Sequence, residues 1–95
     1  MFLAIAIHHA APDHIDDLLG HMNRVAENVK GAPGLLEFEC LRESDGTRLI
    51  GFSRWDSQAS FEAALPQIGQ FSDQRQPDWS TQPDELLMLT RPDSA

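Results

Sequence analysis

Two side chains at the ends of expected strands can take part in chemistry: His8 in FLAIAIHH and Trp55 in RLIGFSRW. An imidazole has a pKa of about 6.5, so a well-positioned histidine can take up a proton at neutral pH. An indole offers a flat apolar wall and one N–H donor. These types predict two catalytic residues: His8 as a general base, and Trp55 as an aromatic wall and N–H donor to the ligand. For His8, the alternative is a strand-end histidine with no role in chemistry.

The residues that alternate with Trp55 are small. Gly51 and Ser53 share its expected face, and Ala4 and Ala6 share one face of the first strand. Small side chains beside an aromatic wall leave a void that fits a planar apolar ligand. We therefore interpret Gly51, Ser53 and Ala6 as ligand contacts. The alternative is that Trp55 fills the core and bonds its N–H locally.

A third polar group lies on an expected helix. His14, Asp17 and His21 are spaced i, i+3 and i+7, which places them opposite the apolar stripe. Divalent metals take such ligands, but the outer face of a helix is usually a solvated polar stripe, so we predict no metal site. The chain has no GxGxxG, CxxC or HExxH pattern, and we expect no bound cofactor.

Four segments have the apolar pattern of β-strands: residues 2–9, 35–43, 48–55 and 85–91. The first is apolar on both faces, which is typical of a strand buried on two sides. The turn sequence SDG joins the second and third as a β-hairpin. Arg54 is expected to pair with Glu37 or Glu39 of the neighbouring strand, or with a partner subunit.

Two segments have the apolar spacing of helices. The first contains residues 15–29 and ends at GAPG, where two glycines and a proline follow. The second begins at a cap formed by Asp56 or Ser57 and continues to Ile68. Pro66 is expected to kink or restart this helix, because proline lacks the N–H that an interior turn requires.

Residues 69–83 are rich in Gly, Pro, Gln, Ser and Asp and are expected to form a long loop, anchored by Phe71 and Trp79. Loops of this length in small domains are usually functional or interfacial. We include Trp79 among the expected ligand contacts, for a loop that closes over the void. Residues 91–95 are expected to be a flexible tail.

The order βαββαβ predicts an α+β, ferredoxin-like fold, in which a four-stranded antiparallel sheet carries both helices on one face. The other face would then expose a row of large apolar side chains: Leu3, Ile5, Ile7, Ile50 and Phe52. A patch of this size is unusual on a monomer. We therefore expect a homodimer in which a second copy covers the open face of the sheet.

Composition narrows the class of protein. The 95 residues are enough for a single domain, 1–95, and 15 acidic against 7 basic side chains give a formal net charge of -8. This charge disfavours nucleic acid and anionic lipid as partners. The run FLAIAI is too short to span a membrane. The only cysteine, Cys40, is expected to be a reduced core thiol, and the protein is expected to be cytoplasmic.

Three motifs carry a resemblance to a known family over nearly the whole chain: APDHIDDLL at the first helix, GAPGLLEFE before the second strand, and SRWDSQASFEAAL, in which Trp55 precedes a capped helix. With them the sequence resembles the antibiotic biosynthesis monooxygenase-like family. The resemblance implies a dimeric α+β barrel and a pocket for a small aromatic or quinone-type compound.

The same resemblance implies a cofactor-independent monooxygenase, in which the substrate itself supplies electrons to oxygen. A non-catalytic binding or structural dimer of the same fold is the alternative. Haem-degrading members of the family rely on an Asn in the first strand, a Trp in the third and a His on the second helix. Residues 2–9 contain no Asn and residues 57–70 contain no His, which disfavours haem binding or degradation.

Overall fold

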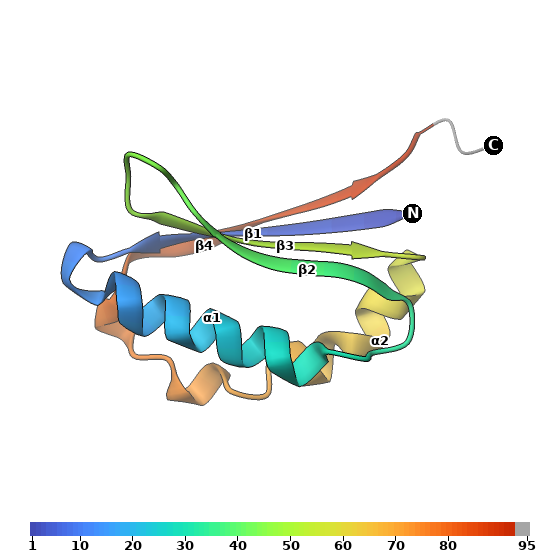
Figure 1. The fold of residues 1–95 in the computed structure, drawn as a ribbon, viewed down its shortest axis with the longest axis horizontal. Coiled ribbons are helices and arrows are strands. Elements are labelled where there is room, and N and C mark those ends of the chain that lie inside the picture. Colours follow the sequence, from blue (N-terminus) through green and yellow to red (C-terminus); the bar gives the residue numbers. More distant parts are fainter. Residues whose placement is uncertain (93–95) are drawn as a thin grey trace.

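The computed structural model describes residues 1–92, which form two layers. The strands and helices are, in chain order, β1 (Phe2–Ala10), α1 (Ile15–Val29), β2 (Leu35–Arg42), β3 (Arg48–Trp55), α2 (Gln58–Ile68) and β4 (Ser80–Thr90). The strands form one antiparallel sheet in the order β2-β3-β1-β4, and both helices lie on the same side of it (Figure 1). The predicted ferredoxin-like α+β fold is confirmed.

Local chemistry explains where the helices begin and end. A short 3-10 turn, η1 (Pro12–His14), precedes α1, and Gly31 and Gly34 follow it with φ of 83° and 84°. Glycine tolerates such positive φ, so the chain can leave the helix and enter β2. The hydroxyl of Ser57 caps α2 by accepting a hydrogen bond from the backbone N–H of Ser60.

Of the two outcomes expected at Pro66, a kink or a restart of the helix, the restart does not occur. Helix α2 continues without interruption through Pro66 to Ile68. Proline removes one N–H, and the carbonyl that it leaves free belongs to Glu62, which is exposed, so that water can satisfy it near the helix end.

The expected loop at residues 69–83 is shorter than predicted. It contains two 3-10 turns, η2 (Ser72–Gln74) and η3 (Pro77–Trp79), and β4 already begins at Ser80. The register between β1 and β4 shifts after Ile7, so that Pro83 and Asp84 lie opposite His8 alone. This is a β-bulge, and it accommodates a proline that cannot donate to the strand ladder.

Trp55 lies in the core between the sheet and α2. Its side chain is fully buried at 0% exposure, and its ring packs edge-on against Phe61 with centroids 5.7 Å apart. Its N–H donates to the hydroxyl of Ser53 at 2.9 Å, and that hydroxyl donates to the carbonyl of Ala4 at 3.3 Å. These contacts join β1, β3 and α2 around one indole.

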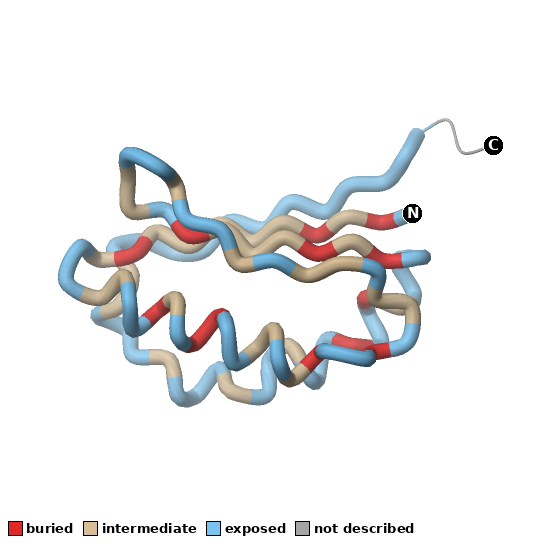
Figure 2. The backbone as a smooth tube through the Cα atoms, viewed as in Figure 1, coloured by how far each residue is buried: buried red, intermediate tan, exposed pale blue. Residues whose placement is uncertain are grey.

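Burial is uneven across the sheet. Buried positions occur in β1, β3 and both helices, whereas β4 is exposed from Thr81 to Thr90 (Figure 2). Of the tail expected at residues 91–95, residues 93–95 lie outside the described part of the chain. Within residues 1–92, no helix is long and apolar enough to cross a membrane.

Replacing Trp55 with Ala is expected to lower the free energy of unfolding by about 3–5 kcal/mol, because it leaves a cavity and removes the hydrogen-bond donor to Ser53. Urea unfolding followed by far-ultraviolet circular dichroism measures this change. Glu62→Ala, on the exposed side of α2, is the control and should change the value by less than about 0.5 kcal/mol. Equal stability of the two variants would show that Trp55 is not central to the core.

Candidate functional site

A cavity of about 320 Å³ lies between the sheet and the two helices. Among the residues that were expected to contact a ligand, His8, Ala6, Gly51 and Ser53 line it. Strand alternation directs all four to the helix side of the sheet, as the sequence pattern indicates.

Small residues in the sheet create this space. A Cβ added to Gly51 would lie 3.8 Å from the Cβ of Ala6 and 3.9 Å from the terminal methyl carbon of Met22. These are ordinary contacts, so a larger residue at position 51 would occupy the cavity rather than strain the sheet. The opposite wall is apolar and comes from both helices, with Val25 on α1 and Phe61 on α2.

The cavity is open along β4. Leu86 lines it and is 53% exposed, because neither helix covers this edge strand. An apolar compound therefore has a route from the surface into the space between sheet and helices.

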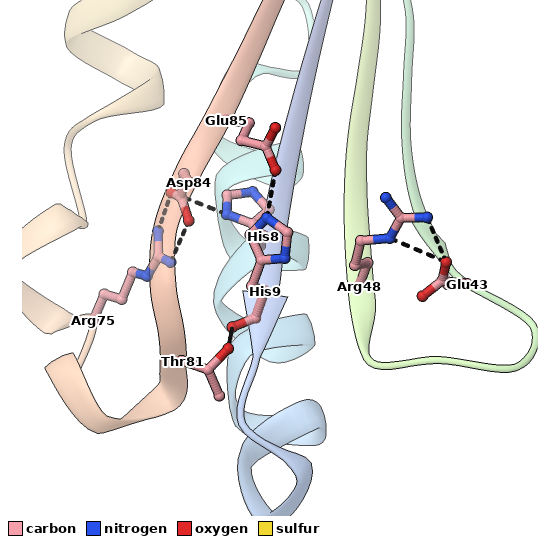
Figure 3. Close-up of polar contacts among 8 residues, drawn as sticks. All are labelled: His8, His9, Glu43, Arg48, Arg75, Thr81, Asp84 and Glu85. Carbon is pink, nitrogen blue, oxygen red and sulfur yellow. Dashed lines mark hydrogen bonds and ion pairs between the residues drawn. The ribbon is translucent and has the colours of Figure 1, made fainter.

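At the polar end of the cavity, the carboxylate of Asp84 contacts both His8 and Arg75 (Figure 3). Oδ2 of Asp84 lies 3.1 Å from Nδ1 of His8, and Arg75 donates two hydrogen bonds to the two carboxylate oxygens at 2.6 and 2.7 Å. Arg75 also donates to the hydroxyl of Ser80 at 2.7 Å. Segments from β1, β4 and the stretch between η2 and η3 thus meet at Asp84, and the bulge at Pro83 brings it opposite His8.

The protonation states follow from burial and charge. Burial lowers the pKa of His8 below its ordinary 6.5, and the carboxylate of Asp84 only partly offsets this. Burial alone would raise the pKa of Asp84, but the hydrogen bonds from Arg75 and the nearby charges outweigh it, so the pKa lies below its usual value. At neutral pH, His8 is therefore an uncharged imidazole next to an ion pair between Asp84 and Arg75.

His21 lies in the same cavity, which differs from the expectation for α1. Its side chain was placed with His14 and Asp17 on the outer face of the helix, but it is only 8% exposed and lines the cavity. Position 21 lies between Leu18 and Val25 along one edge of the apolar stripe, which explains its burial. Its Nδ1 is buried and has no hydrogen-bond partner within residues 1–92.

Two expected ligand contacts do not line the cavity. Trp55 lies in the core next to it, so the local N–H bond to Ser53 replaces the expected role as a ligand wall. Trp79, directly before β4, packs against a buried apolar cluster that includes Leu18 and Leu49. Its ring lies edge-on to that of His21, with centroids 6.4 Å apart, so Trp79 contacts the site through His21.

The remaining polar groups have structural roles. His14 pairs with Asp17 at 2.9 Å, and residues 1–92 contain no cluster of three or more potential metal ligands. Arg54 pairs with Glu37 at 3.3 Å, as expected.

Sequence reasoning missed three residues of the site, Asp84, Arg75 and His21. Asp84 could have been found by aligning ELLMLTR antiparallel to FLAIAIHH, because the start of the last strand then lies beside His8. His21 had a signal in its i+3 spacing from Leu18 and its i+4 spacing to Val25. No sequence pattern marks Arg75, which reaches Asp84 only through the turns between η2 and η3.

Many solved structures share this fold, and three of them illustrate it. Rv0793 from Mycobacterium tuberculosis superposes with a TM-score of 0.82 at 20% identity, covering 99% of this chain and 97% of that chain. PA3566 from Pseudomonas aeruginosa gives 0.78 at 19% identity, with 95% and 92% covered. The haem-degrader MhuD from Mycobacterium tuberculosis, solved with two haems in its active site, gives 0.73 at 24% identity, with 93% and 92% covered. At these identities the likeness establishes the fold alone.

The architecture defines the class of protein as a ferredoxin-like domain with an apolar cavity between sheet and helices. The family model for antibiotic biosynthesis monooxygenase matches residues 1–66, and the chain belongs to that family. No curated protein matches the sequence.

The histidines are expected to titrate in a defined order. The hydrogen bond to Asp17 raises the pKa of His14 above 6.5, whereas burial lowers those of His8 and His21 below it. A pH titration of the histidine ring signals by NMR measures all three. Because the unfolded chain binds protons more tightly at His8 and His21, the free energy of unfolding should decrease as the pH falls below about 6.5.

The variant Asp84→Asn provides the control for this assignment. It removes the charge that raises the pKa of His8 and leaves the positive charge of Arg75 nearby, so the pKa of His8 should fall further. The pKa of His14 should stay unchanged. An increase at His8 in this variant would contradict the geometry in Figure 3.

Proposed function

We propose that this protein is a cofactor-independent monooxygenase that acts on a small aromatic or quinone-type compound in the cavity. The observation that carries the proposal is the position of an uncharged histidine, His8, at the polar end of an otherwise apolar cavity. Membership of the antibiotic biosynthesis monooxygenase family supports the reaction class.

The roles follow from the contacts at the polar end. Asp84 occupies the Nδ1 side of the His8 ring, which leaves Nε2 to accept a proton from the substrate. Arg75 holds the carboxylate of Asp84 with two hydrogen bonds, so Asp84 orients the ring and stabilises the imidazolium that forms. The apolar walls exclude water and hold the flat part of the substrate.

The substrate supplies the electrons in this reaction. Proton transfer to His8 converts an anthrone or a related phenol into an electron-rich anion, which can reduce dioxygen. For a ring CH₂ group, a C–O bond then forms and the O–O bond breaks, so that one oxygen atom remains as a carbonyl and the other leaves as water. Dioxygen is the only co-reactant, and no bound cofactor is required.

A binding protein without catalysis is the second candidate. The burial of Trp55 favours it, because its N–H is already bonded to Ser53 and is not available to a substrate. The cavity would then bind an aromatic compound without oxidising it.

The same proposal includes a homodimer with the arrangement of an α+β barrel. Cross-strand pairing places eight large apolar residues on the sheet face opposite the helices: Leu3, Ile5, Ile7, Leu41, Ile50, Phe52, Leu87 and Leu89. Of these, Leu41, Leu87 and Leu89 are more than 40% exposed. A second copy packed against this face would remove the patch from water.

Oxygen consumption tests the reaction. The purified, metal-free protein is expected to consume oxygen with an anthrone, a naphthol or a hydroquinone faster than the buffer does. His8→Ala should lower this rate by about 10²- to 10⁴-fold, because it removes the general base. His14→Ala, at a half-exposed histidine on η1 that does not line the cavity, is the matched control and should keep the rate.

Two other results would overturn the reaction. If no compound causes oxygen uptake but several raise the melting temperature, the protein binds without oxidising. If added haemin gives a Soret band and is degraded, the relevant substrate is haem.

Sedimentation equilibrium at micromolar concentration tests the dimer. The wild-type protein should have twice the chain mass of 10.6 kDa. Ile5→Glu, which places a charge in the middle of the apolar face, should shift the equilibrium to monomer, while Glu62→Ala on α2 should not. A stable wild-type monomer would remove the basis for the barrel.

A further inference from the structure

His21 is the buried polar side chain that the proposed reaction does not use. It is 8% exposed, and its Nδ1 has no partner within residues 1–92. A buried polar atom without a hydrogen bond costs about 1–3 kcal/mol, so such atoms usually have a partner in the functional state. Its ring is fixed between the cavity and Trp79, whose indole packs edge-on against it.

The cavity's polar end carries no net charge at neutral pH. His8 and His21 are uncharged because burial lowers the pKa of each, and Asp84 and Arg75 neutralise one another. Arg24 lies close enough to lower the pKa of His21, but it donates to Gln74 and does not line the cavity. Within residues 1–92, the one cation that lines the cavity, Arg75, is already paired with Asp84, so none is left there to balance a carboxylate or phosphate. Burial of an unpaired anion is costly, so an uncharged ligand is favoured.

We propose that Nδ1 of His21 forms a hydrogen bond with a hydroxyl or keto oxygen of the ligand, and that the cavity thereby selects uncharged, oxygen-bearing ring compounds over hydrocarbons and aromatic carboxylates. This deepens the proposed function, because it names a second polar contact in the same cavity. His8 accepts the proton in the reaction, whereas His21 positions the oxygen atom.

A neutral imidazole has one N–H donor and one acceptor nitrogen, and a hydroxyl group can serve either. A hydroxyl-bearing ring therefore fits His21 in both tautomers. A keto oxygen fits only the tautomer that carries its proton on Nδ1. A hydrocarbon of the same shape leaves this atom unpaired and forfeits the bond.

The test compares 1-naphthol, naphthalene and 1-naphthoate by NMR titration under nitrogen, where no oxidation can occur. The wild-type protein should bind 1-naphthol about 2- to 12-fold more tightly than naphthalene, which corresponds to one buried hydrogen bond. It should bind 1-naphthoate more weakly than either compound.

Two variants assign the preference to His21. His21→Phe should bind the naphthol and naphthalene equally, and His21→Gln, which can still form a hydrogen bond, should restore part of the preference. His14→Ala is the control on the neighbouring turn and should behave as wild type. Long-range ¹H–¹⁵N spectra should show the Nδ1 signal of His21 shift with 1-naphthol but not with naphthalene.

The outcomes separate this inference from the proposed reaction. An unchanged preference for 1-naphthol in His21→Phe would overturn it, as would an Nδ1 signal that does not respond. Absence of oxygen uptake with the preference intact would overturn the reaction while the contact at His21 stands. If His21→Phe does not fold, His21→Gln and the ¹⁵N signal decide the question.

Discussion

The carboxylate of Asp84 is the contact on which the arrangement of the site depends. It connects β1, through His8, to the turns after α2, through Arg75, and it lies itself in β4. These segments are far apart in sequence and converge at one group. Without that charge, the guanidinium of Arg75 would lie beside two neutral imidazoles with the hydroxyl of Ser80 as its partner and no anion to balance it. One ion pair thus fixes both the geometry and the charge balance at the cavity's polar end.

The division between core and cavity rests on residue size along two strands. On β3, Trp55 packs fully buried beneath α2, while Ser53 and Gly51, two and four residues earlier, leave space. Ala4 and Ala6 continue that space on β1. The hydroxyl of Ser53 lies at the boundary, since it accepts from the indole and also lines the cavity. A large aromatic and a void are therefore neighbours on the same face of the sheet.

The fold could be predicted from the sequence because its apolar periodicities are clear. The apolar stripe of α1 indicates only a helix, and the alternation in β2 and β3 indicates only strands. The same alternation correctly assigned His8, Ala6, Gly51 and Ser53 to one face of the sheet. It could not decide whether Trp55 lies in the void or beside it, because both positions share that face. Asp84 was missed because a bulge changes the register at Pro83. His21 was missed because it lies at the edge of the apolar stripe of α1. At such a position, the helical spacing does not decide whether a side chain faces the solvent or the cavity.

The bulge at Pro83 also affects the exposed edge of the sheet that β4 forms. A strand at the margin of a sheet offers free backbone N–H and C=O groups to any other strand, which is a common route to aggregation. In β4, Pro83 and the irregular register interrupt the row of free backbone groups near Gln82. Two charged residues, Asp84 and Glu85, follow directly. The uncharged run LLML at residues 86–89 remains, and its side chains are 43–56% exposed. The N-terminal part of β4 is thus protected against unwanted strand pairing, and LLML is the segment at which such pairing would begin.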